Sequence, residues 1–247
     1  MKLFRADLHV HTVLSPCGDL EMSPAKIVEV AARRGIDILG ITDHNSTRQV
    51  PLICKLAKEV GIFVLMGAEV TTREEVHCLV FFEDLEKLSA FQEYLDRYLP
   101  DIPNDAKYFG YQVVVDELEN IVDTENRLLI SGLDQSLDQV RQQVYSLGGL
   151  FIPAHIDRMR FSLTSQLGFV PKGFAADAFE VSRNNTPEQM KQKFPWIASA
   201  SFIRGSDAHT LEDIGGNLTL LEMERRSFDE VYKALHRIDN RTNRIAS

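Results

Sequence analysis

The residues of this sequence that could do the most chemistry are its seven histidines. Six of them lie at or beside the expected end of a strand: His9, His11, His44, His77, His155 and His209. His236 is the exception, in the middle of an expected helix. Because the C-terminal ends of parallel strands meet at one face of an α/β barrel, where ligands and catalytic groups gather, we expect the six imidazoles to share one site.

Two pairs of side chains have the i, i+2 spacing that places both on one side of a strand. His9 and His11 form the first pair, and Asp207 and His209 form the second on the last expected core strand. One such pair is a weak signal on its own. Two of them at the same end of different strands favour a metal site.

Glu69 closes the apolar run 62–68, where a carboxylate without a partner is costly. Its partner is either a metal ion or an arginine such as Arg73. The remaining polar groups each have a structural alternative as well: a helix cap (Asp43), a loop histidine (His44) or a hydrogen-bonded core histidine (His77 and His155).

The number of candidate ligands indicates how many ions the site would hold. Eight side chains qualify: His9, His11, His44, Glu69, His77, His155, Asp207 and His209. One ion takes about four to six ligands, so the surplus favours two or three divalent ions. Imidazole with carboxylate suits Zn, Mn or Fe. Bridged ions of this kind hold a hydroxide nucleophile and clamp a phosphoryl group.

Four motifs in order resemble the polymerase and histidinol phosphatase (PHP) family. They are Asp7-Leu8-His9-Val10-His11-Thr12, Thr42-Asp43-His44-Asn45, Pro153-Ala154-His155 and Gly205-Ser206-Asp207-Ala208-His209, with Glu69 and His77 between them. The resemblance implies an α/β fold, a distorted (β/α)7 TIM-like barrel, with a trinuclear metal site at its C-terminal face. It also implies metal-dependent phosphoester hydrolysis, an ester hydrolase activity of class EC 3.1.

The resemblance further implies three ligand sets, of which the first two share Glu69 as a bridge. The first set is His9, His11, Glu69 and Asp207; the second is Glu69, His77 and His155; the third is His44, His209 and a group from the loop after His11. That loop departs from the commonest family pattern, in which an acid or histidine follows closely. Asp19 is the expected third-site ligand here, and Glu21 is the alternative.

Three further residues are expected to support the reaction. Arg158 and Arg183 follow strand ends and would bind phosphate through the guanidinium fork, although either could form a structural ion pair. Asp43 would orient the His44 imidazole, since metal-bound imidazoles usually donate their second N–H to an acceptor.

The elements that must position these groups alternate between strands and helices, as in a sheet of βα units. Strands are expected over Leu3–His9, Asp37–Thr42, Ile62–Glu69, His77–Phe82, Gly149–His155, Asp177–Ser182 and Ser201–Asp207, with Leu218–Met223 as an edge strand. Helices are expected after Ser23, over Leu85–Leu99, and after the caps Ser136, Thr186 and Ser227. A small hairpin, with strands Tyr111–Val115 and Leu128–Ser131, marks an insertion at about 104–132. The tail is expected to be a helix whose arginines, Arg237, Arg241 and Arg244, form a solvated basic face.

Composition narrows the class of protein. An apolar fraction of 44% with 26% charged residues is typical of a globular chain, here taken as one domain over residues 1–247. The formal charge of −9 favours a small phosphorylated substrate, and nucleic acid is possible but not favoured. The three cysteines are few and far apart, so we expect reduced, small apolar residues. No apolar stretch is long enough for a membrane span, and a cytoplasmic location is the default expectation.

Two other classes of function remain open at this stage. One is an amidohydrolase-like deaminase or amidase, which also begins with a His-x-His strand. The other is a non-catalytic regulatory module that binds metal. A metal count near three would separate the first alternative from a phosphoesterase, and turnover of a phosphoester would exclude the second.

Overall fold

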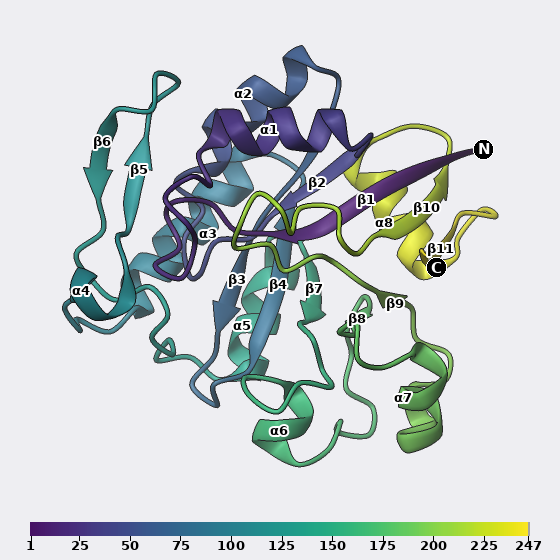
Figure 1. Ribbon diagram of the computed structural model, residues 1–247. Helices are drawn as coiled ribbons and strands as arrows, with labels where there is room; N and C mark the ends of the chain where they lie inside the picture. Colours follow the sequence, from purple (N-terminus) through teal and green to yellow (C-terminus); the bar gives the residue numbers. More distant parts are fainter. Residues whose placement is uncertain (247) are drawn as a thin grey trace.

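Seven strands form one curled, mixed sheet in the computed structural model, which describes residues 1–246 (Figure 1). Their order across the sheet is β11-β10-β1-β2-β3-β4-β7. Their bounds are β1 Lys2–Val10, β2 Ile38–Ile41, β3 Phe63–Thr71, β4 His77–Phe82, β7 Leu150–Pro153, β10 Thr219–Met223 and β11 Thr242–Ile245. Two short pairs stand outside this sheet: β5 Val113–Val115 with β6 Ile121–Thr124, and β8 Phe179–Glu180 with β9 Phe202–Ile203.

Helices follow most of the strands and start where local capping signals place them. Their bounds are α1 Pro24–Arg33, α2 Val50–Glu59, α3 Leu85–Tyr98, α4 Ala106–Phe109, α5 Leu137–Ser146, α6 Leu163–Leu167, α7 Pro187–Lys193 and α8 Phe228–His236, with a 3₁₀ turn, η1, at Pro195–Ile197. The predicted capping boxes at Ser136 and Thr186 are present, and the Ser227 side chain accepts from the backbone N–H of Glu230. The Ser23 side chain instead donates to Glu119 in the hairpin insertion.

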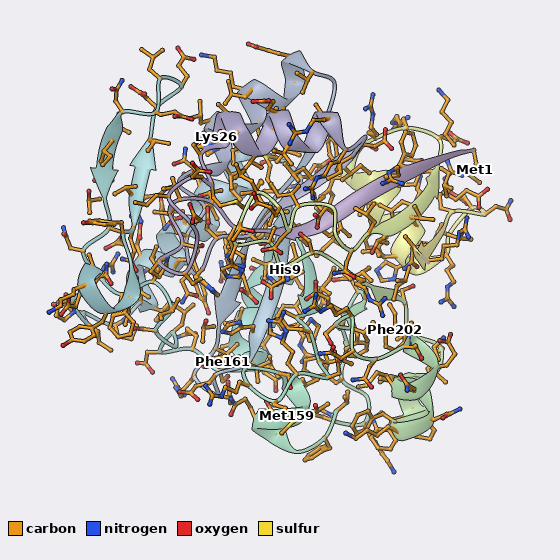
Figure 2. All side chains as sticks on the ribbon, in the orientation of Figure 1. Met1, His9, Lys26, Met159, Phe161 and Phe202 are labelled. Atoms are coloured by element: carbon orange, nitrogen blue, oxygen red, sulfur yellow. The ribbon has the colours of Figure 1, made fainter. Side chains whose placement is uncertain are left out.

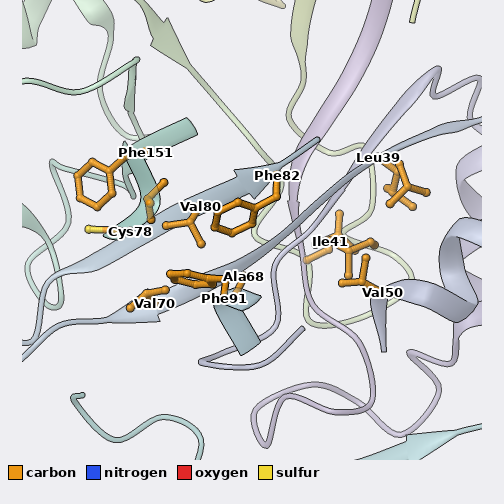
Figure 3. Packing of buried hydrophobic residues seen from close by; sticks show 14 of the residues in the cluster. Leu39, Ile41, Val50, Ala68, Val70, Cys78, Val80, Phe82, Phe91 and Phe151 are labelled. Carbon is orange, nitrogen blue, oxygen red and sulfur yellow. The ribbon is translucent and has the colours of Figure 1, made fainter. Parts of the chain in front are cut away.

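The sheet separates two groups of buried apolar side chains. The outer cluster lies between the sheet and the helices and includes Ile41, Val80 and Phe82 (Figure 3). The inner cluster fills the concave side and includes Leu65 and Leu79. Because side chains alternate along a strand, the polar residues in phase with the inner cluster emerge at the open end of that concave side.

The predicted α/β, barrel-like fold is confirmed, and a strand overlaps each of the eight positions expected outside the insertion. Backbone hydrogen bonds continue the curl beyond β7, from the N–H of Asp177 to the carbonyl of Phe151 (3.0 Å). Ala208 exchanges backbone bonds with the end of β1 and the residue after it, donating to His9 (3.2 Å) and accepting from His11 (3.0 Å).

Strand β4 differs from an all-parallel barrel because it runs antiparallel to both β3 and β7. The five residues between β3 and β4 form a tight turn, and a parallel crossover would need about a dozen residues or more. The reversal brings the start of β4, and not its end, to the same edge as the end of β3.

Two sequence predictions about the outlying segments are wrong in detail. In the insertion, β5 pairs with β6, whereas Leu128–Ser131 forms a turn whose carbonyls bind the Asn45 side chain. The tail is not a solvated helix, because α8 ends at His236 and the chain returns as β11 beside β10. Arg241 is buried there and donates two hydrogen bonds to Glu230 of α8.

Among residues 1–246, none of the helices has the length and apolar character that crossing a lipid bilayer requires.

Candidate metal centre

A β-bulge aims the first histidine pair at the concave side of the sheet. The register between β1 and β2 shifts between Asp7 and Val10, and Leu8 packs in the inner cluster whereas Val10 packs in the outer one. Bulges of this kind redirect side chains next to active sites. His9 and His11 therefore emerge together, with their Nε2 atoms 3.2 Å apart.

Glu69, near the end of β3, lies at the centre of the histidines. Its Oε2 atom is 3.4 Å from Nε2 of both His9 and His11 and 3.2 Å from Nδ1 of His44. Its Oε1 atom is 2.9 Å from Nδ1 of His77 and 3.1 Å from Nε2 of His155. The two carboxylate oxygens of Glu69 thus face two different sets of histidines. His77 reaches it only because β4 is antiparallel.

The second predicted pair lies on an irregular segment and not on a strand. Asp207 has a φ of +52°, and its Oδ1 atom is 3.2 Å from Nε2 of His9 and 3.3 Å from Nε2 of His11. His209 stacks on His11 with ring centroids 4.2 Å apart. His155 also has a positive φ, +30°, so strained backbone occurs at two residues of this cluster.

Three overlapping groups of side chains could each hold an ion. In each group, one ligand atom per residue lies within 4.8 Å of the others: His9, His11, Glu69 and Asp207; His44, Glu69 and His77; His11, His44 and His209. The first group is the set expected from the resemblance. The second group contains His44 and not the expected His155. His44 faces Oε2 of Glu69, whereas His155 faces Oε1.

The buried polar atoms fit a cation at this site. Nδ1 of His155 is buried without a hydrogen-bond partner, and Nδ1 of His44 forms no hydrogen bond with Oε2 of Glu69 although the two atoms are 3.2 Å apart, whereas buried polar atoms are normally satisfied. Burial alone would raise the pKa of Glu69, but the imidazoles of His77, His9 and His44 hold it well below its usual value. Burial acts likewise on the pKa of Asp207, and His9 and His11 hold it low. Ionised carboxylates and free imidazole nitrogens are what divalent ions bind.

Two acids fix the orientation of the first histidine pair. Glu180, on β8, lies with both carboxylate oxygens 3.1 Å from Nδ1 of His9, which leaves Nε2 free for a metal. Asp43 accepts from the Ser15 hydroxyl (2.7 Å), and Ser15 Oγ in turn accepts from Nδ1 of His11 (3.0 Å).

The expected role of Asp43 therefore shifts from His44 to His11. Its other bonds come from Thr12, through the backbone N–H (2.7 Å) and the hydroxyl (2.8 Å). Glu180 is a residue that the motifs do not identify. The signal that could have found it is the same one that singles out Glu69, an acid within an apolar strand.

The loop after His11 brings a different residue to the site from the one expected. Asp19 is exposed and its carboxylate accepts from the backbone N–H of Glu21, which itself pairs with Lys26 at 3.5 Å. The Cys17 sulfur, in contrast, lies 3.1 Å from Nε2 of His209. Neither acid belongs to the three groups described above.

The two predicted arginines lie around one cavity of about 400 Å³ beside the first group of ligands. Arg158 pairs with Asp207 at 2.5 Å, and Arg183 lines the same cavity. Arg158 also lines a second cavity of about 400 Å³, together with His77 and Phe161.

The chain is similar in sequence or in fold to several known proteins. The PHP domain model matches residues 7–245. YqxK of Bacillus subtilis is 26% identical over 279 aligned positions, which cover 98% of this chain and 64% of YqxK. Endonuclease Q of Pyrococcus furiosus superposes with a TM-score of 0.75 at 19% identity, over 98% of this chain and 58% of the endonuclease. The chain thus spans less than two thirds of the length of either protein.

Another similar protein of known structure is about as long as this chain. It comes from Bifidobacterium adolescentis and is assigned as a metal-dependent phosphoesterase. It superposes with a TM-score of 0.59 at 24% identity, over 94% of this chain and 96% of that protein.

One sequence-based expectation about partners is wrong. The net negative charge predicts that nucleic acid is disfavoured, yet endonuclease Q, whose fold extends over 98% of this chain, crystallised in complex with a 27-mer duplex bearing an abasic lesion at its active site. Net charge sums the whole surface and does not describe the mouth of one site, where Arg158 and Arg183 lie.

Since the family model extends from Asp7 to Ile245, the chain belongs to the PHP family of metal-dependent phosphoesterases.

Proposed function

We propose that this chain hydrolyses phosphodiester bonds in nucleic acid with two to three divalent ions. The observation that carries the proposal is Glu69, whose two buried oxygens each face a separate set of histidines beneath an arginine-lined cavity. An arrangement with one bridging carboxylate suits adjacent ions, which is the usual way to clamp a phosphoryl group.

In this proposal the three groups would supply the ligands of up to three ions. The ligands of the first are His9, His11, Glu69 and Asp207; of the second, Glu69 with His77, His44 and His155; of the third, His11, His44 and His209, with the sulfur of Cys17 beside them. Imidazole and carboxylate are compatible with Zn, Mn or Fe, whereas the sulfur favours Zn or Fe over harder ions. Bound ions supply Lewis-acid polarisation of the phosphate and a nucleophilic hydroxide at neutral pH.

The residues of the chain itself orient the reaction. Glu180 and Ser15 fix the imidazoles of His9 and His11 through their Nδ1 atoms, so that both Nε2 atoms face inward. Arg158 lies at the edge of the site, 44% exposed and paired with Asp207. Its five donors allow it to keep that ion pair and contact a phosphate oxygen at the same time.

The shape of the site favours a strand of nucleic acid over a small monoester. The two cavities adjoin, because both are lined by His155, Arg158 and Asn184. In this proposal a strand would lie across both cavities, with one phosphate beside His155 and Asp207. Endonuclease Q, with its abasic-site duplex, supports this class of substrate through a shared fold.

The first test uses 5′-labelled oligonucleotides, single-stranded, duplex, and duplex with one abasic site, incubated with metal-loaded protein. We expect cleavage by the wild type and a loss of about 10²-fold or more in Asp207→Asn, which removes a charged ligand of the first ion. Asp138→Asn is the matched control, because Asp138 lies on α5 and pairs only with Arg141 among the described residues.

Two outcomes would contradict the proposal. If metal-loaded protein cleaves none of these substrates but releases ammonia or amine from amide compounds, the amidohydrolase alternative takes its place. An amidohydrolase of Chromobacterium violaceum shares the fold at a TM-score of 0.54 and 19% identity, which makes this comparison worthwhile. If no substrate of either class turns over, a regulatory module is the better description.

A further inference from the structure

The loop after β7 exposes two large apolar side chains beside the metal centre. Met159 is 91% exposed and Phe161 is 41% exposed (Figure 2). Exposed apolar side chains that cluster beside a polar site are typical of binding surfaces. The two residues are separated by Arg160, which is also exposed.

This loop is held in place by hydrogen bonds. The carbonyl of Phe161 accepts from the backbone N–H of His77 at 2.9 Å, and Phe161 has a φ of +55°. The Ser162 hydroxyl donates to the carbonyl of Arg158 at 2.7 Å, and it also caps α6. The backbone N–H of Arg158 donates to the carbonyl of His155 at 2.9 Å. The apolar side chains are therefore presented by a fixed loop, and a strained residue at its tip suggests a functional constraint.

The Phe161 ring connects the loop to the metal ligands. It stacks on the His77 imidazole with centroids 4.8 Å apart and an angle of 12° between the planes. Both rings line the second cavity, together with Met159 and Arg160. A planar group in this cavity would meet the aromatic ring and the thioether beside the candidate ligands His77 and His155.

The charge around this cavity suits the backbone of a nucleic acid strand. Arg160 and Arg183 have no acidic partner within 4.0 Å among residues 1–246, unlike Arg158. Arg160 lines the Phe161 cavity and Arg183 lines the other one. Two guanidinium groups without an acidic partner, one in each cavity, would each have a phosphate to bind if a strand passes over the site.

We propose that Phe161, with Met159, is a stacking platform for the nucleobase next to the scissile phosphate, and that Arg160 binds the next phosphate. The inference rests on the proposed function and adds a subsite that depends on the base. Base–aromatic stacking tolerates any sequence because every base has a π-face. The subsite would thus give affinity for a strand without sequence preference.

The test compares two oligonucleotides that differ only in the base next to the cleaved bond, which is present in one and absent in the other. Phe161→Ala should lower kcat/KM on the strand with the base by about 5- to 100-fold, the range of one stacked base. On the strand without that base its effect should be about twofold or less, since there is nothing to stack. Phe161→Trp should restore cleavage, because tryptophan stacks at least as well as phenylalanine.

Phe169→Ala is the matched control, since Phe169 is 53% exposed and follows α6 outside both cavities. Thermal melting of each variant shows whether it is folded. Equal losses on both strands in a folded Phe161→Ala variant would overturn the inference and make Phe161 a structural support for His77.

Binding of both strands is measured in parallel by fluorescence anisotropy. A wild type that neither cleaves nor binds would refute the proposed function and this inference together, whereas cleavage without a base-dependent loss refutes the inference alone.

Discussion

At the scale of single residues, the carboxylate oxygens of three acids determine how the imidazoles of the site are oriented. Glu69 contacts two sides of the site with its two oxygens, and Glu180 and Asp43 act from behind the first histidine pair. The sequence singled out Glu69, which closes a long apolar run, and Asp43, which lies in a motif, whereas Glu180 lies in no motif and follows a shorter apolar run. The same limit applies to Cys17, whose neighbour His209 is 192 residues away in the chain.

The first residue-scale prediction concerns the third ion. Cys17→Ser should lower bound metal by about one ion per chain and abolish the sulfur-to-cobalt charge-transfer absorption of Co²⁺-loaded protein, because a thiolate is a strong ligand for such ions. Asp19→Asn should change neither, since the Asp19 carboxylate is bound to the backbone of Glu21. Metal content by mass spectrometry and the near-ultraviolet spectrum check both. The reverse pattern would return Asp19 to the site.

At the scale of elements, an ion pair joins the last helix to the last strand. Arg241 donates through Nη2 to Glu230 (2.9 Å) and through Nε (3.2 Å), and it also reaches Glu224 at 3.1 Å. The tail thereby holds α8 against β10 and β11, behind the strand that carries the first histidine pair. The arginine spacing in the sequence suggested a solvated face, since helical periodicity cannot foresee a chain reversal.

This ion pair predicts a dependence of stability on pH. Hydrogen bonds from Arg241 hold the pKa of Glu230 below its usual 4.5 in the folded protein. The unfolded chain therefore binds the proton more tightly, so the stabilisation is present above pH 4.5 and is lost as the pH falls through the folded-state pKa. Glu230→Gln should lower Tm at pH 7, and its deficit should shrink at acidic pH.

Thermal melts of wild type and variant across pH 3–7 check this prediction. Glu224→Gln is the control, because Glu224 contacts the same arginine but is 60% exposed and should matter little. A deficit that stays constant with pH would mean that packing, and not charge, explains the loss.

At the scale of the whole molecule, the metal centre joins segments that are distant in sequence. Its ligands come from β1, β3, β4, and the segments after β2, β7 and β9, so ions would connect most of the barrel. Without a cation, unpartnered nitrogens of His44 and His155 are buried together with ionised acids. Metal binding should therefore stabilise the fold as a unit.

The predicted stabilisation by metal is tested by removing the ions with a chelator and then adding metal again. An ion at 100 times its Kd adds about 2.7 kcal/mol per site, which for a chain of this size raises Tm by roughly 5 to 10 °C. We expect that rise when Mn²⁺ or Zn²⁺ is added to chelated protein, measured by scanning calorimetry, and a much smaller one in Asp207→Asn. An unchanged Tm in the wild type would show that the ions do not bind the folded site.

The sequence by itself determined the chemistry of the centre and most of the framework that carries it. The candidate histidines and acids stand out by residue type, by their apolar context and, for two pairs, by i, i+2 spacing, and the helix caps are local signals, so both can be identified without knowledge of distant contacts. The tertiary structure decided the direction of β4, the position of Cys17 and Glu180, the burial of Arg241, and the arginine-lined mouth that net charge concealed. The physical reason is the same in each case, because these features depend on which distant segments pack together. Patterning along the chain records which residues are buried, but not which segments they meet.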